Sequence, residues 1–304
     1  MIRKIFILSA LCLLLYEAQA QQDPLYSQYM FNMLGINPAY AGSRDLLSVT
    51  ALGRSQWSGM KGAPSSQAIL ADFSVKEKKV GLGLQFFNDK IGITKTTGIN
   101  LSYAYRLRFK KGMLSMGLQG GIASFKANYS DVQLSTADAS DIAFANNINE
   151  IRPTVGAGVY YTTDKFYVGV SVPHLLHLDS YYSKSNSGSM YENNHWMLAT
   201  GFVHHFSPDV VLKPSVLLRA VSGAPLTVDV NANMWFYNVV ALGVSVRTSN
   251  MVVGMLEIQA NRQFRFGYAY DFNTSGLTGR GSHEIMLRYE FGYEKKRMYS
   301  PRYF

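Results

Sequence analysis

Apolar and polar residues alternate along most of this chain with a period of two. The clearest stretch is 264–293, where Ile285, Leu287 and Tyr289 fall on one parity and Glu284 and Arg288 on the other. Successive side chains of a β-strand point to opposite faces of the pleated backbone. The pattern therefore predicts a hairpin with one apolar face and one face of charged residues and glycine.

The same alternation predicts fourteen strands. They span 46–54, 66–75, 79–87, 97–109, 113–126, 152–161, 165–172, 194–205, 210–221, 226–236, 239–247, 251–261, 264–272 and 283–293. Charged residues within these segments fall on the face opposite the large apolar residues. They are Asp72, Arg106, Arg108, Arg152, Lys213, Arg219, Asp229, Arg247, Glu257, Arg265, Asp271, Arg288 and Glu290. Arg54 and Lys126, at strand ends, fit this rule less well.

Two folds provide cover for one apolar face on every strand. A soluble two-sheet sandwich buries that face in a core, whereas a membrane barrel turns it to lipid and turns the charged face to the lumen. The charge placement favours the barrel, because an Arg or Lys that faces the middle of a bilayer costs about 2–4 kcal/mol. A sandwich also has no need of ten-residue strands throughout.

The lengths of the connections give an independent test. Short connections are 76–78, 110–112, 162–164, 206–209, 237–238 and 262–263, and they alternate with long ones at 127–151, 173–193 and 273–282 and moderate ones at 55–65 and 88–96. Outer-membrane barrels have short periplasmic turns and longer outside loops. We therefore predict an all-β fold, a single antiparallel transmembrane β-barrel of about 14 strands in the outer membrane.

The two ends of the chain differ from the barrel. Residues 1–20 have the positive end, apolar run and small-residue cleavage site of a secretory signal peptide, so the mature chain is expected to begin at about Gln21. Residues 21–45 form an arm rich in aromatic residues and methionine, which needs cover from water. We predict that this arm is periplasmic or lumenal and that it plugs the lumen if it enters. The barrel then spans 46–293, and a basic tail follows at 294–304.

The composition limits the classes of partner that this chain is expected to bind. The formal net charge is +9, but no zinc, helix-turn-helix or RNA-binding signature accompanies it, so we expect no nucleic acid partner. An exported basic protein is better matched to outer-membrane lipid, lipopolysaccharide or acidic proteins. Charged residues make up only 16% of the chain, whereas Tyr and Phe number 20 and 17, as suits a wall in contact with lipid.

No catalytic, cofactor or metal residues are predicted. The one cysteine, Cys12, lies in the predicted signal peptide, which excludes thiolate chemistry from the mature chain. His174, His177 and Asp179 make a poor metal site without a fourth ligand. His283 lies between Ser282 and Glu284 on a strand, where neighbours face opposite ways and cannot converge as a triad. An outer-membrane hydrolase is therefore an unsupported alternative.

Two blocks of sequence resemble the PorP/SprF family, outer-membrane proteins of the type IX secretion and gliding apparatus of Bacteroidetes. The N-terminal block comprises Gln21-Gln22-Asp23-Pro24, Ser27-Gln28-Tyr29-Met30, Asn32, Ile36-Asn37-Pro38-Ala39-Tyr40-Ala41-Gly42-Ser43, Arg54, Gln56-Trp57, Gly59 and Gly62-Ala63-Pro64. The C-terminal block comprises Phe266-Gly267-Tyr268, Tyr270-Asp271 and Gly281-Ser282-His283-Glu284-Ile285, and Lys213-Pro214-Ser215 resembles a middle element.

The resemblance implies a non-enzymatic component that assists secretion or surface anchoring of a client with a type IX C-terminal signal, such as a secreted adhesin. It also implies contacts with periplasmic components of the secretion machine. The candidate partner-binding residues are Tyr29, Asn32, Asn37, Pro38, Tyr40, Arg54 and Trp57. Each has a structural interpretation too: Asn37-Pro38 is a turn former, and Trp57 suits an outer aromatic belt. A general porin or solute channel is the alternative function.

Overall fold

The computed structural model describes residues 26–75, 79–129, 147–175, 194–222, 224–248, 250–274 and 281–291. The predicted signal peptide 1–20 and tail 294–304 lie outside these ranges, as do most of the predicted long connections 127–151, 173–193 and 273–282. Among the described residues, no helix is long and apolar enough to cross a membrane.

Short helical turns precede a series of strands. They are η1 (Tyr29–Phe31), α2 (Met33–Ile36), η2 (Pro38–Tyr40), β1 (Ser48–Ser55), β2 (Ser65–Val75), β3 (Val80–Ile91), β4 (Thr94–Phe109), β5 (Gly112–Ala127), β6 (Ile148–Thr162), β7 (Phe166–Val172), β8 (His195–Phe202), β9 (His204–His205), β10 (Val210–Val221), β11 (Thr227–Phe236), β12 (Val240–Arg247), β13 (Met251–Gln259), β14 (Phe264–Asn273) and β15 (Ser282–Glu290).

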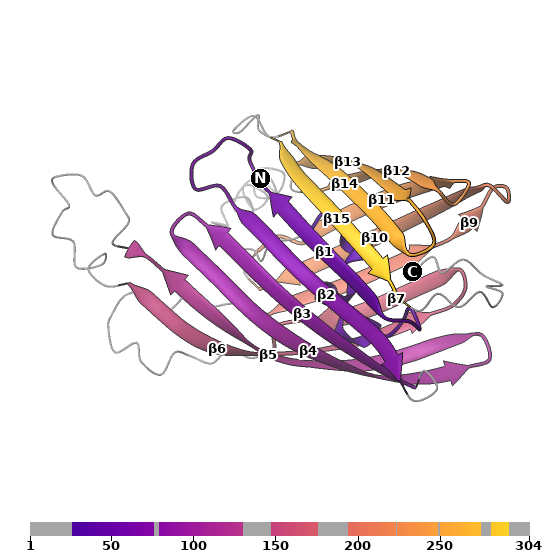
Figure 1. The fold of residues 1–304 in the computed structure, drawn as a ribbon, viewed down its shortest axis with the longest axis horizontal. Coiled ribbons are helices and arrows are strands. Elements are labelled where there is room, and N and C mark those ends of the chain that lie inside the picture. The colour runs from indigo at the N-terminus through magenta and orange to yellow at the C-terminus, as the bar shows by residue number, and fades with distance from the viewer. Residues whose placement is uncertain are drawn as a thin grey trace, which may run out of the picture.

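The strands close into one ring. Consecutive strands pair antiparallel, with the exception of β8 and β9, which both pair with β10. The last strand, β15, pairs with β1 from Ser48↔Glu290 to Ser55↔His283. β9 continues β8 past Val203, since both pair with β10. Counted in this way, the described residues form a closed antiparallel barrel of fourteen strands (Figure 1), and the predicted fold is confirmed.

One predicted connection is wrong. The moderate loop at 88–96 is a tight hairpin: β3 runs to Ile91, β4 begins at Thr94, and Gly92 turns the chain with a φ of +57°. The prediction failed because these added residues are mainly polar, so the apolar alternation stops before the strands do. As a result β3 and β4 extend past the lipid-facing part of the wall.

The two faces of the wall separate by chemistry. Large apolar side chains point outward, and Leu101 and Leu118 are 64% and 65% exposed. Most of the charges predicted to face inward are buried within the ring, including Asp72, Arg106 and Arg219. Arg54, which fitted the parity rule less well, is also inward and buried. The sandwich alternative is excluded, because one closed sheet has no second sheet to cover its outer face.

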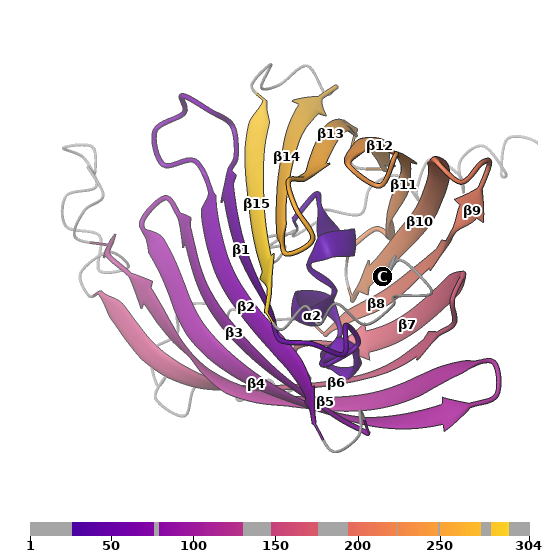
Figure 2. The same ribbon diagram turned by 45° about the vertical axis from the view of Figure 1, so that its right-hand side comes forward.

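The segment that precedes β1 lies at the centre of this ring. Residues 26–45, here called the plug, carry η1, α2 and η2 and lie inside the barrel (Figure 2). Tyr29, Leu34 and Tyr40 are buried and form one apolar cluster with wall residues such as Leu217 and Met286. The hydrophobic core of this barrel is thus the contact between its own N-terminal arm and the inner wall. Fourteen strands enclose a wider space than the eight whose side chains alone fill a barrel.

Candidate functional site: the lumenal plug

The first turn of the plug is bound to a buried ion-pair cluster on the wall. Arg54 on β1 donates from Nη1 to Glu284 Oε2 (3.0 Å) and from Nη2 to Asp271 Oδ2 (2.5 Å). These three side chains, here called the Arg54 cluster, are at most 2% exposed. With two carboxylates for one guanidinium, the cluster needs further hydrogen-bond donors, because buried charges are costly unless fully paired.

The plug supplies those donors. The backbone N–H groups of Ser27 and Gln28 donate to the two carboxylate oxygens of Glu284 at 2.7 and 2.9 Å. The Ser27 hydroxyl donates to Asp271 Oδ2 at 2.9 Å and accepts from Arg54 at 2.8 Å. Hydrogen bonds to charged groups are about twice as strong as neutral ones. The Arg54 cluster and the start of the plug therefore stabilise each other.

Asn37 holds the middle of the plug. Its Nδ2 donates to the carbonyl of Val159 on β6 (3.0 Å) and to that of Val170 on β7 (3.4 Å). Its Oδ1 accepts from Ala39 N at 2.9 Å, which caps η2, and Pro38 occupies the first turn. One side chain thus caps a helical turn and bonds two adjacent strands.

Tyrosines surround the same region. Tyr40 packs edge-on against Tyr160, with ring centroids 5.5 Å apart. Tyr29 reaches across to β10, where its hydroxyl lies 3.0 Å from Ser215 Oγ.

Glycines on the inner wall let the plug approach the strands closely. A Cβ on Gly117 of β5 would lie 2.3 Å from Ala39 N, and one on Gly81 of β3 would lie 1.9 Å from Ala41 O. Both partners are backbone atoms, which cannot move aside as a flexible side chain can. The inner faces of these two strands are therefore shaped to fit this segment of the chain.

The last residues of the plug are bound at the other end of the barrel. Gly42 N donates to Asp72 Oδ2 (3.1 Å), and Arg106 donates to Gly42 O (2.7 Å). Arg44 and Glu290 form an ion pair at 2.5 Å. The Arg54 cluster lies where β14 meets β15 at the long-connection end, whereas Glu290 ends β15 at the short-turn end. The plug therefore spans the lumen along its axis and is bound at both ends.

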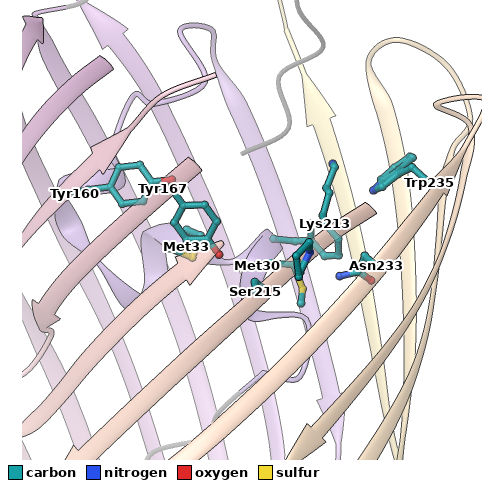
Figure 3. Close-up of a pocket in the computed structure, with 10 residues that line it drawn as sticks. Met30, Met33, Tyr160, Tyr167, Lys213, Ser215, Asn233 and Trp235 are labelled. Atoms are coloured by element: carbon teal, nitrogen blue, oxygen red, sulfur yellow. The ribbon is translucent and has the colours of Figure 1, made fainter. Parts of the chain in front are cut away.

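A small cavity remains beside the plug (Figure 3). Its lining includes Met30, Met33, Tyr167, Lys213 and Trp235, and Lys213 Nζ lies 4.7 Å from the centre of the Trp235 ring. Its volume is about 30 Å³, which holds one or two water molecules, since each needs about 10–15 Å³. This space is too small for a solute.

The structure brings most of the predicted site residues together. Five lie buried in the plug, and Arg54 faces them from the wall; the five are Tyr29, Asn32, Asn37, Pro38 and Tyr40. Trp57 lies apart, in the connection after β1, where its backbone N–H donates to Ser282 Oγ at 3.3 Å. Partner binding by these seven residues stays a prediction. Of the five in the plug, Tyr29, Asn37, Pro38 and Tyr40 contact the inner wall.

The sequence does not single out the two carboxylates as site residues. Parity predicts that Asp271 and Glu284 lie on the charged face, but it does not tell which strands close the ring and so which charges meet. A signal was present, since both residues stand in the C-terminal block that resembles the family while Arg54 stands in the N-terminal one. Ser27 and Gln28 belong to that N-terminal block as well.

Histidines form no catalytic or metal cluster in the described part of the chain. His283 lies on the outer face with its Nδ1 2.7 Å from the Tyr268 hydroxyl, while Ser282 and Glu284 point inward, as strand parity predicts. No group of three or more His, Cys, Asp or Glu within those ranges is placed to hold a metal ion. His177 and Asp179 lie outside them.

Comparison with known proteins identifies one family. The family model described as "Type IX secretion system membrane protein PorP/SprF" matches residues 18–289. No curated protein sequence matches the chain.

Several solved structures are similar at low identity. The Acinetobacter baumannii outer membrane protein Omp33 has a TM-score of 0.48 at 6% identity, over 81% of this chain and 98% of that one. The TodX deltaS2S3 mutant monoaromatic hydrocarbon channel has 0.48 at 11%, over 85% and 94%. The KdgM porin in complex with disordered oligogalacturonate has 0.40 at 9%, over 81% and 99%. Such scores carry no argument on what this chain binds.

Replacing Arg54 tests the cluster. Arg54→Gln leaves two buried carboxylates without their cation, and breaking a buried pair costs about 3–5 kcal/mol. We expect chymotrypsin to cleave after Tyr26, Tyr29 or Phe31 in the detergent-solubilised variant but not in the parent. Arg152→Gln is the control, because its partner Glu150 is about one-third exposed and such pairs contribute about 0–1 kcal/mol. Equal protease resistance of both variants would show that the cluster does not hold the plug.

A pair of glycines on β5 tests the fit of the plug. Gly117→Ala sets a methyl group against the backbone of Ala39, whereas Gly120→Ala on the same strand meets nothing within 4 Å. We expect Gly117→Ala to lower the thermal midpoint of the folded barrel by several degrees and Gly120→Ala to leave it unchanged or raise it slightly. If both substitutions behave alike, the plug does not lie against β5 as described.

Proposed function

The chain belongs to the PorP/SprF family of type IX secretion system membrane proteins, and from this premise we propose that it is a plugged accessory or anchor rather than a conduit. In this role it assists secretion, or surface retention, of a client protein that carries a type IX C-terminal signal. The family and the barrel assign it to the outer membrane. We propose that the short turns face the periplasm and the long connections face outside, as in other outer-membrane barrels.

The filled lumen is the observation that supports an anchor. The plug occupies the axis, its side chains pack into the core, and both of its ends are held by buried ion pairs or charge-assisted hydrogen bonds. A polypeptide or solute that passed through would first have to displace about twenty residues. A barrel of this kind presents a rigid outer rim, on which a partner docks without opening the lumen.

The predicted partner-binding residues fit this proposal in two ways. The six lumenal ones act through the plug, because Arg54, Tyr29 and Asn37 among them fix it to the wall. Trp57 lies in the 56–64 connection at the rim, next to residues such as Met60, which is 40% exposed. It is therefore the one of the seven that is placed to contact a client directly.

Conductance distinguishes an anchor from the alternative, a porin or solute channel. In planar bilayers we expect the purified protein to be silent, and Arg54→Gln to show intermittent openings as the plug is released. A large, stable conductance of the unmodified protein would favour the channel instead.

The same proposal makes a cellular prediction. Deletion of the gene should leave at least one protein with a type IX C-terminal signal in the periplasm, or release it from the surface into the medium. Expression of the intact chain should restore its location, and Arg54→Gln should restore it only in part. If surface proteomics finds every such protein in its normal place after deletion, the accessory role is refuted, whatever the conductance.

A further inference from the structure

Three lysines stand side by side at one rim of the barrel. Lys90 on β3 pairs with Lys95 on β4, and Lys95 pairs with Lys126 on β5. Residues directly opposite on adjacent strands have Cβ atoms about 4.5–5.5 Å apart, so the three side chains form a row on one face of the sheet.

Among the described residues, no acidic side chain on this face neutralises the row. All three lysines are exposed, and within the described ranges none of their ammonium groups makes an ion pair or hydrogen bond. The nearest described acidic residues, Asp89 on β3 and Glu150 on the neighbouring β6, have the opposite parity and face the inside of the ring. Like charges directly opposite on a sheet are destabilising, so an anion bound here would remove a cost that the free protein carries.

The row faces outward, on the same side as the lipid-facing residues. Along β4 the outward parity runs from Lys95 through Ile99, Leu101 and Tyr103 to Phe109, and these apolar side chains are 41–64% exposed. The same face carries Phe86 on β3 and Ile122 on β5, both exposed. The lysines therefore continue the outer wall and do not line the lumen.

Strand geometry places the row at headgroup level. From Ile99 to Phe109 the strand advances about 33 Å, which gives about 25 Å of height at a tilt of about 40°, the height of the apolar band of an outer-membrane barrel. Lys95 lies four residues beyond Ile99, about 10 Å above that band by the same geometry. Charged lipid headgroups lie in this layer.

The row of lysines lies on the side of the outer leaflet. It stands at the end of the barrel where the long connection after Ala127 leaves the sheet, opposite the short turn at Lys110 and Lys111. Long connections of such barrels face outside.

A hollow at the same rim offers room for a headgroup. It has a volume of about 340 Å³ and is lined by Asn88, Lys90, Gly92, Ile93, Thr94, Lys95 and Asn128. Sites for small ligands begin at about 300 Å³. The lining combines two of the three lysines with amide and hydroxyl side chains, which suits a phosphorylated sugar better than an apolar group.

We propose that Lys90, Lys95 and Lys126 bind the phosphate groups of a phosphorylated glycolipid of the outer leaflet, with its acyl chains against Phe86, Ile99 and Ile122. Ammonium groups bind phosphate oxygens through charge-assisted hydrogen bonds, and the apolar wall directly below accepts the chains. Inorganic phosphate can bind the ammonium groups, but it has no acyl chains to contact the apolar wall. This inference concerns the outer wall of the barrel and does not depend on the client role.

Lipid binding to the full-length chain in a non-ionic detergent tests the proposal. The probes are bisphosphorylated lipid A, its fully dephosphorylated form and inorganic phosphate, with bound molecules counted by native mass spectrometry. The test variant carries Lys90→Gln, Lys95→Gln and Lys126→Gln. The control variant carries Lys110→Gln, Lys111→Gln and Lys165→Gln, the same change of charge in turns at the opposite rim.

Bisphosphorylated lipid A should bind the unmodified protein and the control alike, and bind the test variant about tenfold or more weakly, since each basic residue near an anionic lipid surface contributes separately. It should also raise the thermal midpoint of the unmodified protein but not that of the test variant. Without lipid, the test variant should be at least as stable as the parent, because the repulsion is gone.

Three results would overturn the proposal. Equal loss of lipid A binding in both variants would mean that net charge, and not this row, attracts the lipid. If the dephosphorylated lipid bound as tightly as bisphosphorylated lipid A, the acyl chains alone would account for binding and the lysines would not contribute. Competition by inorganic phosphate at the concentration of the lipid would indicate a site for free phosphate.

Discussion

The constraint that governs this structure is the burial of charge inside a closed ring. Strands that turn their apolar residues to lipid must turn their charges inward, and a fourteen-stranded ring is too wide for its own side chains to fill. Some of these charges pair on the wall itself, as Arg247 does with Asp229, but others need partners that the wall alone does not supply. The plug provides them through backbone N–H groups at Glu284 and Asp72 and through Arg44 at Glu290.

Strand parity predicted the larger part of this arrangement. The fourteen strands and the inward direction of their charges follow from the period of two, because lipid imposes that period on every strand. The signal weakens where the hydrocarbon of the bilayer no longer touches the wall, and for this reason the alternation predicts a loop where β3 and β4 form a hairpin. The length of these strands places the added residues above the hydrocarbon core, at the level of the headgroups, where the alternation of polar and apolar positions is not imposed.

Contacts between the first and last strands lie beyond what the pattern can predict. Arg54 and Glu284 are 230 residues apart in the chain, and their neighbouring strands β1 and β15 meet only because the ring closes. Arg54 fits the parity rule less well because it lies at the end of its predicted strand, and the structure places an apolar residue, Leu52, on the same inward side. A mixed inner face arises where the plug, itself apolar, covers the wall. The residues of the candidate site were thus identifiable, but their roles were not.

The filled lumen bears on the proposed role. Because the inward charges at Glu284, Asp72 and Glu290 are bound to the N-terminal segment, the described residues leave no open path along the axis, as the proposal of an accessory or anchor requires.

The most direct test of this account is amide hydrogen exchange of residues 26–45 in the membrane-embedded protein. The account predicts that the amides of Ser27, Gln28 and Gly42 are protected to the same degree as those of the central strands. Exchange at the rate of a free peptide throughout this segment would show that the plug does not occupy the lumen, and would contradict the account.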